Sequence, residues 1–181
     1  GEVLEAKPAL VINLEMITVM GGAMEVAGNV GSSSSIENEV AEWNIYVDPR
    51  AAAEVFGSGV PITLVPLDAT NYAPLTMEFY RRLERDRTTS VAEFVYRVLA
   101  AQEENVRSGW YYFWDPLAAA IATEEGLGTF REMSLIVVEE EGAESGRTLE
   151  SERGSIIRVA MTADRERFET LFLDAMNGRL P

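Results

Sequence analysis

Polar side chains stand at four places where a predicted strand ends or a predicted helix begins. They are Met20 beside two glycines, Asn29, the pair Glu42 and Asn44, and Asp115. Ligands of α/β folds bind at the carboxyl ends of the strands, where the chain turns toward the next helix. Carboxylate and carbonyl oxygens there are also the ligands that hard cations such as calcium take. These positions are therefore candidates for ligand binding.

Each candidate also has a purely structural explanation. Asn29 lies between glycines and is typical of a turn residue, while Asp115 before Pro116 is typical of a helix cap. Met20 is typical of a core methionine. The spacing of Gly21-Gly22 and Gly28 does not match the dinucleotide-binding fingerprint.

The stretch 41–56, AEWNIYVDPRAAAEVF, contains the densest group of these residues. Asp48 and Pro49 are explained as a helix start, since aspartate accepts from free backbone N–H groups and proline needs no donor there. That explanation leaves Glu42, Trp43 and Asn44 without a role.

Composition limits the chemistry that the chain can perform. It has 181 residues with neither histidine nor cysteine, so Ser-His-Asp and Cys-His triads, disulfides and sulfur-bound zinc are excluded. Acid–base work must fall to Asp, Glu, Tyr or Lys. Catalytic residues cannot be assigned from the sequence.

Charge and hydropathy restrict the partners. Thirty acidic against 15 basic residues give a net charge of −15, which repels nucleic acid and anionic lipid and is compatible with a divalent cation. No apolar run reaches about 18 residues, so we expect no membrane contact and a cytoplasmic protein. A hydrophobic content of 47% supports one domain over residues 1–181.

Apolar runs alternate with helix-start signals, which predicts an α/β fold with a mostly parallel sheet flanked by helices. A capping box at 90–93 should open the helix that follows it. Strands are expected at 16–20, 61–65, 134–138 and 156–161, the last two paired around the polar stretch 139–155; helices at 49–56, 75–85, 90–106 and 164–176; and a long loop at 23–44.

Several motifs follow one another in a fixed order and spacing along the chain. They are Val19-Met20-Gly21-Gly22-Ala23, Gly28-Asn29, the stretch Ala41 to Pro49, Gly59-Val60-Pro61-Ile62, Pro66-Leu67-Asp68, Trp114-Asp115-Pro116-Leu117-Ala118 and Ser145-Gly146-Arg147-Thr148. This pattern closely resembles the inosine-uridine-preferring nucleoside hydrolases, and the similarity covers nearly the whole chain.

The resemblance implies hydrolysis of the N-glycosidic bond of a ribonucleoside with one bound Ca²⁺. Carried over by position, Asp115 matches a calcium ligand, and Glu42 and Asn44 match residues that bind ribose hydroxyls. Asn29 and Met20 match positions that line the ribose pocket. Trp114 stands where many members carry a histidine thought to protonate the leaving base; an indole can stack on a base but is no general acid.

The chain departs from the family in lacking the D-T-D-P-G-x-D-D motif, which supplies most calcium carboxylates and the general base. We therefore expect a C-terminal part of the family fold without its N-terminal strands, an incomplete calcium site and little activity in isolation. Apolar strand edges should then drive homo-oligomerisation or binding of a partner chain that supplies the N-terminal half.

Three alternatives stay open. The chain is one subunit of a split hydrolase, a non-catalytic ribose-binding or assembly module, or an α/β domain whose polar turns only cap helices.

Overall fold

The computed structural model describes residues 1–33 and 36–180. Its contacts divide the chain into two compact units. The first unit comprises Gly1–Ala69 and Thr129–Thr162, and the second comprises Thr70–Gly128 and Ala163–Pro181. That the two units fold as one domain stays a prediction.

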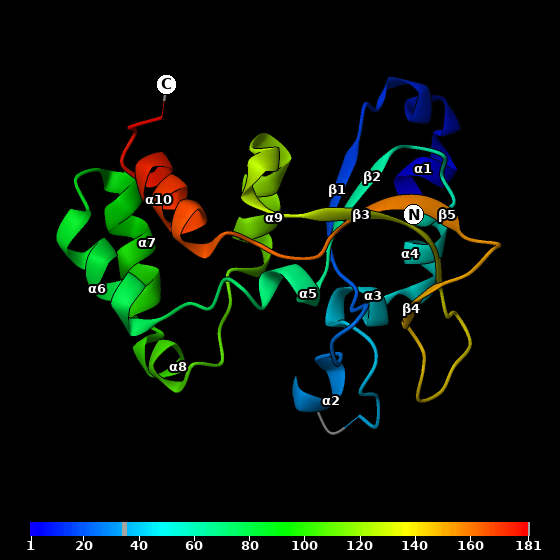
Figure 1. Ribbon diagram of the computed structural model, residues 1–181, viewed down its shortest axis with the longest axis horizontal. Coiled ribbons are helices and arrows are strands. Elements are labelled where there is room, and N and C mark those ends of the chain that lie inside the picture. The colour runs from blue at the N-terminus through cyan, green and yellow to red at the C-terminus, as the bar shows by residue number, and fades with distance from the viewer. Residues whose placement is uncertain (34–35, 181) are drawn as a thin grey trace. The chain divides into compact units, whose positions relative to one another are not determined.

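The first unit contains a five-stranded sheet within the described residues, with strand order β1-β2-β5-β3-β4 (Figure 1). β1 and β2 pair in parallel, as do β2 and β5, whereas β3 is antiparallel to both β5 and β4. The strands are β1 (Ile17–Met20), β2 (Ile62–Val65), β3 (Phe130–Val137), β4 (Thr148–Glu150) and β5 (Ser155–Ala160).

The expected α/β class and the pairing of the two late strands are confirmed. The structure shows that this pairing is antiparallel, and the sheet as a whole is mixed. β2 is buried at all four positions, which fits a strand that has a neighbour on each side. β4 lies inside the stretch expected to be a polar connection. Three residues of sequence Thr-Leu-Glu carry too little apolar alternation to predict a strand.

One face of this sheet forms the core of the first unit. Leu64 of β2, Leu135 of β3 and Val159 of β5 are among its buried members, and Ile45 and Phe56 pack on them from the helical side. α4 (Pro49–Phe56) packs against β3 (Figure 1). Its start confirms the expected cap, because the Asp48 side chain accepts from the Ala51 N–H at 2.9 Å.

The expected long loop at 23–44 is wrong in part, because it contains helical turns. α2 (Val30–Ser33) and α3 (Trp43–Val47) are four and five residues long, too short to show a helical periodicity. The remaining helices of this unit are α1 (Glu2–Ala6), a 3₁₀ helix at Pro8–Asn13, and α5 (Leu67–Thr70), which ends at the boundary with the second unit.

The second unit is helical, and its core contains a group of aromatic rings. Phe79, Phe113, Phe168 and Phe172 contact one another with centroid distances of 4.8 to 6.0 Å. Its helices are α6 (Met77–Asp86), α7 (Ser90–Ala100), α8 (Glu103–Ser108), α9 (Trp114–Thr123), a 3₁₀ helix at Glu125–Leu127, and α10 (Arg165–Met176).

Two expectations about the helix after residue 89 are corrected. Thr89, not Ser90, is the cap, since its hydroxyl accepts from the Ala92 N–H, and Glu93 pairs with Arg87 and Arg97 instead of closing a capping box. The helix also ends at Ala100, and a separate helix, α8, follows.

Candidate active site

Met20 and Asn44 meet at the carboxyl end of β1. Met20 is the last residue of that strand, and Asn44 lies in the first turn of α3. The Asn44 Nδ2 donates to the Met20 carbonyl oxygen and contacts the Met20 Sδ, each at 3.3 Å. The strand and the helix therefore present their polar groups at one place, and Asn44 is exposed there.

Glu42 joins the same group from below the surface. It is 2% exposed, and its Oε2 accepts from the backbone N–H of Asn44 at 2.9 Å and of Ile45 at 3.3 Å, which caps α3. The same oxygen accepts from the Gly22 N–H at 3.3 Å. A buried carboxylate needs such donors to offset its desolvation. Glu42 thus ties the loop after β1 to the helix that carries Asn44.

Asn29 completes the group. Its Oδ1 accepts from the Trp43 N–H at 2.8 Å, one residue before Asn44. The turn that brings it there depends on Gly28, because a Cβ at that position would lie 2.2 Å from the Ala41 carbonyl oxygen. The four residues expected to line a ribose pocket, namely Met20, Asn29, Glu42 and Asn44, are therefore neighbours around the start of α3.

Trp114 and Asp115 lie in the second unit, at the start of α9. The Trp114 ring is half-buried and contacts Tyr111 and Tyr112 at centroid distances of 5.7 and 5.9 Å. Asp115 is exposed in the first helical turn. The explanation of Asp115 as a helix cap is wrong, since Phe113 occupies the cap position and makes no side-chain hydrogen bond there.

The family model of the inosine-uridine preferring nucleoside hydrolases matches residues 2–170. This chain belongs to that family. The match covers the group around α3 in the first unit as well as Trp114 and Asp115 in the second.

Relatives and solved structures agree with this assignment. The chain is 32% identical over 150 residues to nucleoside hydrolase 3 of Arabidopsis thaliana, covering 66% of this chain and 16% of that protein. It is 39% identical over 95 residues to a pyrimidine-specific ribonucleoside hydrolase of Klebsiella pneumoniae, covering 51% of this chain and 28% of that protein.

Among solved structures, the inosine-uridine preferring nucleoside hydrolase of Bacillus anthracis superimposes with a TM-score of 0.83 at 27% identity. That alignment covers 99% of this chain and 56% of the Bacillus chain. A plant nucleoside hydrolase gives a TM-score of 0.84 at 26% identity, covering 97% and 57%. This chain thus spans a little over half the length of these solved relatives.

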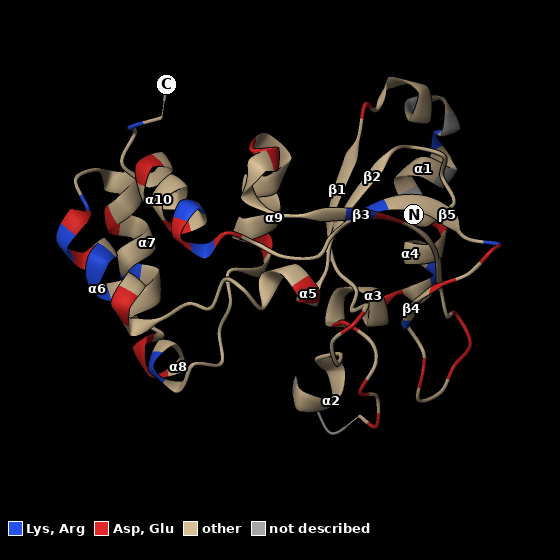
Figure 2. Cartoon of the chain, in the orientation of Figure 1, with Lys and Arg blue, Asp and Glu red and all other residues tan. Residues whose placement is uncertain are grey.

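The acidic side chains in the part of the chain that the structure describes do not by themselves fit a complete calcium site. Over residues 1–33 and 36–180, no group of three or more acidic side chains lies close enough together to hold a metal ion. Affinity for Ca²⁺ rises with the number of charged ligands, and Asp115 belongs to no such group. Figure 2 shows many acidic residues along connections, such as the loop between β3 and β4, instead of in one cluster.

Two residues without an assigned role contact the loop that follows β1. Asp68 is 5% exposed and accepts from the N–H groups of Met24 and Glu25, at 2.8 and 2.7 Å. Thr148 is 4% exposed and binds both backbone groups of Ala23 through its hydroxyl. Both belong to stretches that carried the family resemblance, which is the signal that could have found them.

In the part of the chain that the structure describes, no helix has both the length and the apolar character required to cross a bilayer.

Proposed function

We propose that this chain supplies the sugar-binding part of a ribonucleoside hydrolase site. The observation that carries the proposal is the hydrogen-bonded group around α3, in which Met20, Asn29, Glu42 and Asn44 lie together at the carboxyl end of a parallel strand. Family membership supports the reaction class, which is cleavage of the bond between ribose C1′ and a base nitrogen by water.

The residue types suit a neutral polyol. An amide presents both donors and an acceptor, and a carboxylate presents acceptors, so Asn44 and Glu42 are suited to orient vicinal hydroxyls of ribose. Because Asn44 is held by Met20, and Glu42 by three backbone N–H groups, these side chains are positioned before substrate arrives. In this proposal, the group fixes the sugar while water attacks C1′.

As a separate proposal for the second unit, Trp114 binds the base. Its indole, supported by Tyr111 and Tyr112, offers an aromatic face for stacking on a purine or pyrimidine. It cannot protonate the departing base, and the chain contains no histidine. The general base that activates water and the general acid that protonates the departing nucleobase are therefore left unassigned.

We propose Asp115 as one ligand of a Ca²⁺ ion whose other carboxylates lie outside the described set. Bound at a nucleoside, such an ion would hold hydroxyls and lower the pKa of a water molecule. A partner chain that supplies the N-terminal half, or another copy, is proposed to contribute those carboxylates. The outer edge of β1 has no neighbouring strand within the described residues, which suits such an association.

The alternative of a non-catalytic ribose-binding or assembly module is favoured by one observation, namely that residues 1–33 and 36–180 contain no acidic cluster that could hold a metal ion. A split hydrolase subunit differs from such a module in regaining activity when an N-terminal half is added.

A monomeric, well-folded chain in light scattering at micromolar concentration would contradict the proposed association with another chain or copy. A cytoplasmic location remains part of this proposal.

The test compares uridine binding by the chain and by Asn44→Ala, measured by calorimetry. Removing the amide should weaken binding roughly tenfold, as expected for one lost hydrogen bond in a site. Asp48→Asn is the matched control, because Asp48 caps the neighbouring helix α4 and should leave affinity unchanged. Equal affinity of the Asn44→Ala variant and the unsubstituted chain would refute the proposed sugar site and favour helix capping as the whole role of these residues.

A further inference from the structure

The loop that follows β1 is held by side chains in an unusual way. Residues 22–25, here called the braced loop, form no helix or strand. Their four consecutive N–H groups all donate to side-chain oxygens from distant parts of the sequence. The acceptors are Glu42 Oε2 for Gly22 at 3.3 Å, Thr148 Oγ1 for Ala23 at 3.2 Å, and the two oxygens of Asp68 for Met24 at 2.8 Å and Glu25 at 2.7 Å.

All three acceptors are buried. Glu42, Asp68 and Thr148 are 2%, 5% and 4% exposed. Hydroxyls and carboxylates lose hydration when buried, so the loop amides stabilise them as much as they stabilise the loop. Thr148 also donates to the Ala23 carbonyl oxygen at 3.0 Å, which fixes both polar groups of that residue. These side-chain hydrogen bonds therefore determine the backbone conformation of the braced loop and restrict its motion.

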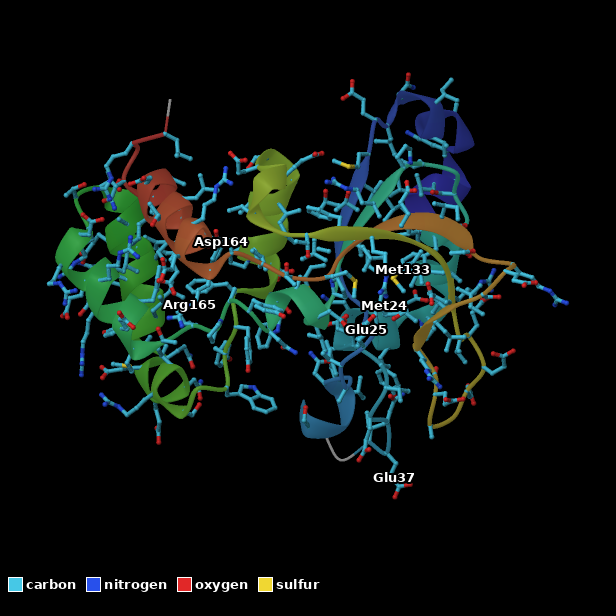
Figure 3. All side chains as sticks on the ribbon, in the orientation of Figure 1. Met24, Glu25, Glu37, Met133, Asp164 and Arg165 are labelled. Carbon is cyan, nitrogen blue, oxygen red and sulfur yellow. The ribbon has the colours of Figure 1, made fainter. Side chains whose placement is uncertain are left out.

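A second contact tightens the brace at its first residue. Gly22 has φ +83°, and a Cβ there would lie 3.2 Å from the Thr148 hydroxyl. Further along, Met24 and Glu25 line one pocket together with Met133 of β3. Figure 3 labels these three side chains. The loop is thus buried at Gly22 and Ala23 and borders an open pocket at Met24 and Glu25.

The braced loop is connected to the sugar-binding group through Glu42. The oxygen that accepts from Gly22 also accepts from the Asn44 N–H, and Asn44 in turn binds the carbonyl of Met20, two residues before Gly22. A displacement of the loop therefore moves Gly22, the Glu42 carboxylate and Asn44 together. Asp68 and Thr148 hold residues 23–25 of the same loop, which directly follow Gly22.

We propose that Asp68 and Thr148 are positioning residues of the nucleoside site, which hold the braced loop so that Glu42 and Asn44 keep the spacing that ribose hydroxyls require. This inference rests on the proposed function, since it assigns residues to the same site. A purely structural role would stabilise the first unit without changing affinity for the sugar.

The test combines amide hydrogen exchange with binding of uridine by the chain. Asp68→Asn replaces one acceptor oxygen by an amide donor that faces a backbone N–H, so exchange at Met24 and Glu25 should rise roughly 10- to 100-fold. Thr148→Val removes the hydroxyl at nearly constant volume, and exchange at Ala23 should rise about 2- to 10-fold. Thr148→Ser keeps the hydroxyl and should restore both exchange and affinity. Asp48→Asn is the control substitution in the same unit.

The outcomes separate the inference from the proposed function. Faster exchange confined to residues 22–25 and 44–45, with uridine affinity reduced about threefold or more by Asp68→Asn and Thr148→Val, supports the positioning role. Faster exchange with unchanged affinity, while the unsubstituted chain binds uridine, overturns it and leaves the proposed function intact. Faster exchange throughout β5 as well would show general destabilisation and would also overturn it. No uridine binding by the unsubstituted chain would refute both.

Discussion

The two units present their candidate site residues in different ways. In the first unit, Glu42, Asn44 and Asn29 are fixed by hydrogen bonds between side chains and backbone, and each residue makes one such bond over 14 or more residues of sequence. In the second, Trp114 is held by ring contacts, and Asp115 is exposed on a helix whose start has no side-chain cap. The candidate residues of the first unit are therefore held in place by the fold, whereas Asp115 of the second lies exposed on its helix.

Electrostatics separates the units in the same way. The first unit buries carboxylates against backbone N–H groups, as Glu42 and Asp68 show. The second unit places several of its carboxylates in ion pairs with arginine near the surface, such as Asp86 with Arg179. Surface pairs contribute little to stability, while a buried carboxylate without its donors is costly. Substitutions should therefore have larger effects on stability in the first unit.

The largest expected effect is at Glu42. Glu42→Ala leaves the N–H groups of Gly22, Asn44 and Ile45 without the carboxylate, and we expect the free energy of unfolding of the first unit to fall by about 3 kcal/mol. Urea unfolding followed by circular dichroism measures this change. Asp48→Ala, which removes a single exposed cap, should cost about 1 kcal/mol. Similar costs for the two variants would remove the contrast between buried and surface caps.

A smaller effect is expected at Trp114. The quantity of interest there is the affinity for uridine relative to the affinity for free ribose. Trp114→Ala removes a stacking surface, so affinity for uridine should fall by about 1 to 2 kcal/mol while affinity for free ribose stays the same. Calorimetric titration of one sample with each ligand gives both values. Equal losses for the two ligands would mean that Trp114 supports the fold of the second unit and not the base.

The smallest effect is the pH dependence of the second unit. Hydrogen bonds from Arg97 and Arg87 hold the pKa of Glu93 below its ordinary value of 4.5, and a hydrogen bond from Arg179 holds the pKa of Asp86 below 3.8. The folded state thus binds fewer protons than the unfolded state. This stabilisation is complete above the ordinary pKa values and is lost as the pH falls through the lowered ones.

Arg97→Ala and Arg179→Ala test this pH dependence. Each variant should unfold more easily than the unsubstituted chain at pH 6, and the difference should shrink as the pH falls below 4. Thermal unfolding at a series of pH values measures this difference in stability. Added salt should reduce the difference as well, because salt screens exposed ion pairs. A difference that persists unchanged in acid would assign it to lost packing of the arginine stem.

Local sequence signals predicted much of this fold. Apolar runs bounded by glycine or proline marked β1 and β2, and Asp48-Pro49 marked the start of α4, because these signals act over a few neighbouring residues. The cap at α3 was not predictable in the same way. Glutamate is not a preferred cap, and its carboxylate reaches Gly22 as well as its own helix.

The brace around residues 22–25 shows what the sequence could not provide. Thr148 and Ala23 are separated by 125 residues, and nothing local in either stretch indicates that they meet. The family resemblance identified which stretches matter, but it gave no reason for Asp68 or Thr148. Folding of the sheet brings β4 and the end of β2 to the same loop, and only that arrangement explains the two residues.

The most direct test of the sugar-binding site is an NMR titration of the isotopically labelled chain with ribose, followed at its backbone and side-chain amides. The account predicts saturable shifts at Gly22, at Trp43 and at the backbone and side-chain amides of Asn44, with residues of α4 unaffected. Absence of saturable shifts at these positions, or shifts confined to other parts of the chain, would contradict the assignment of this group as the sugar-binding part of a nucleoside hydrolase.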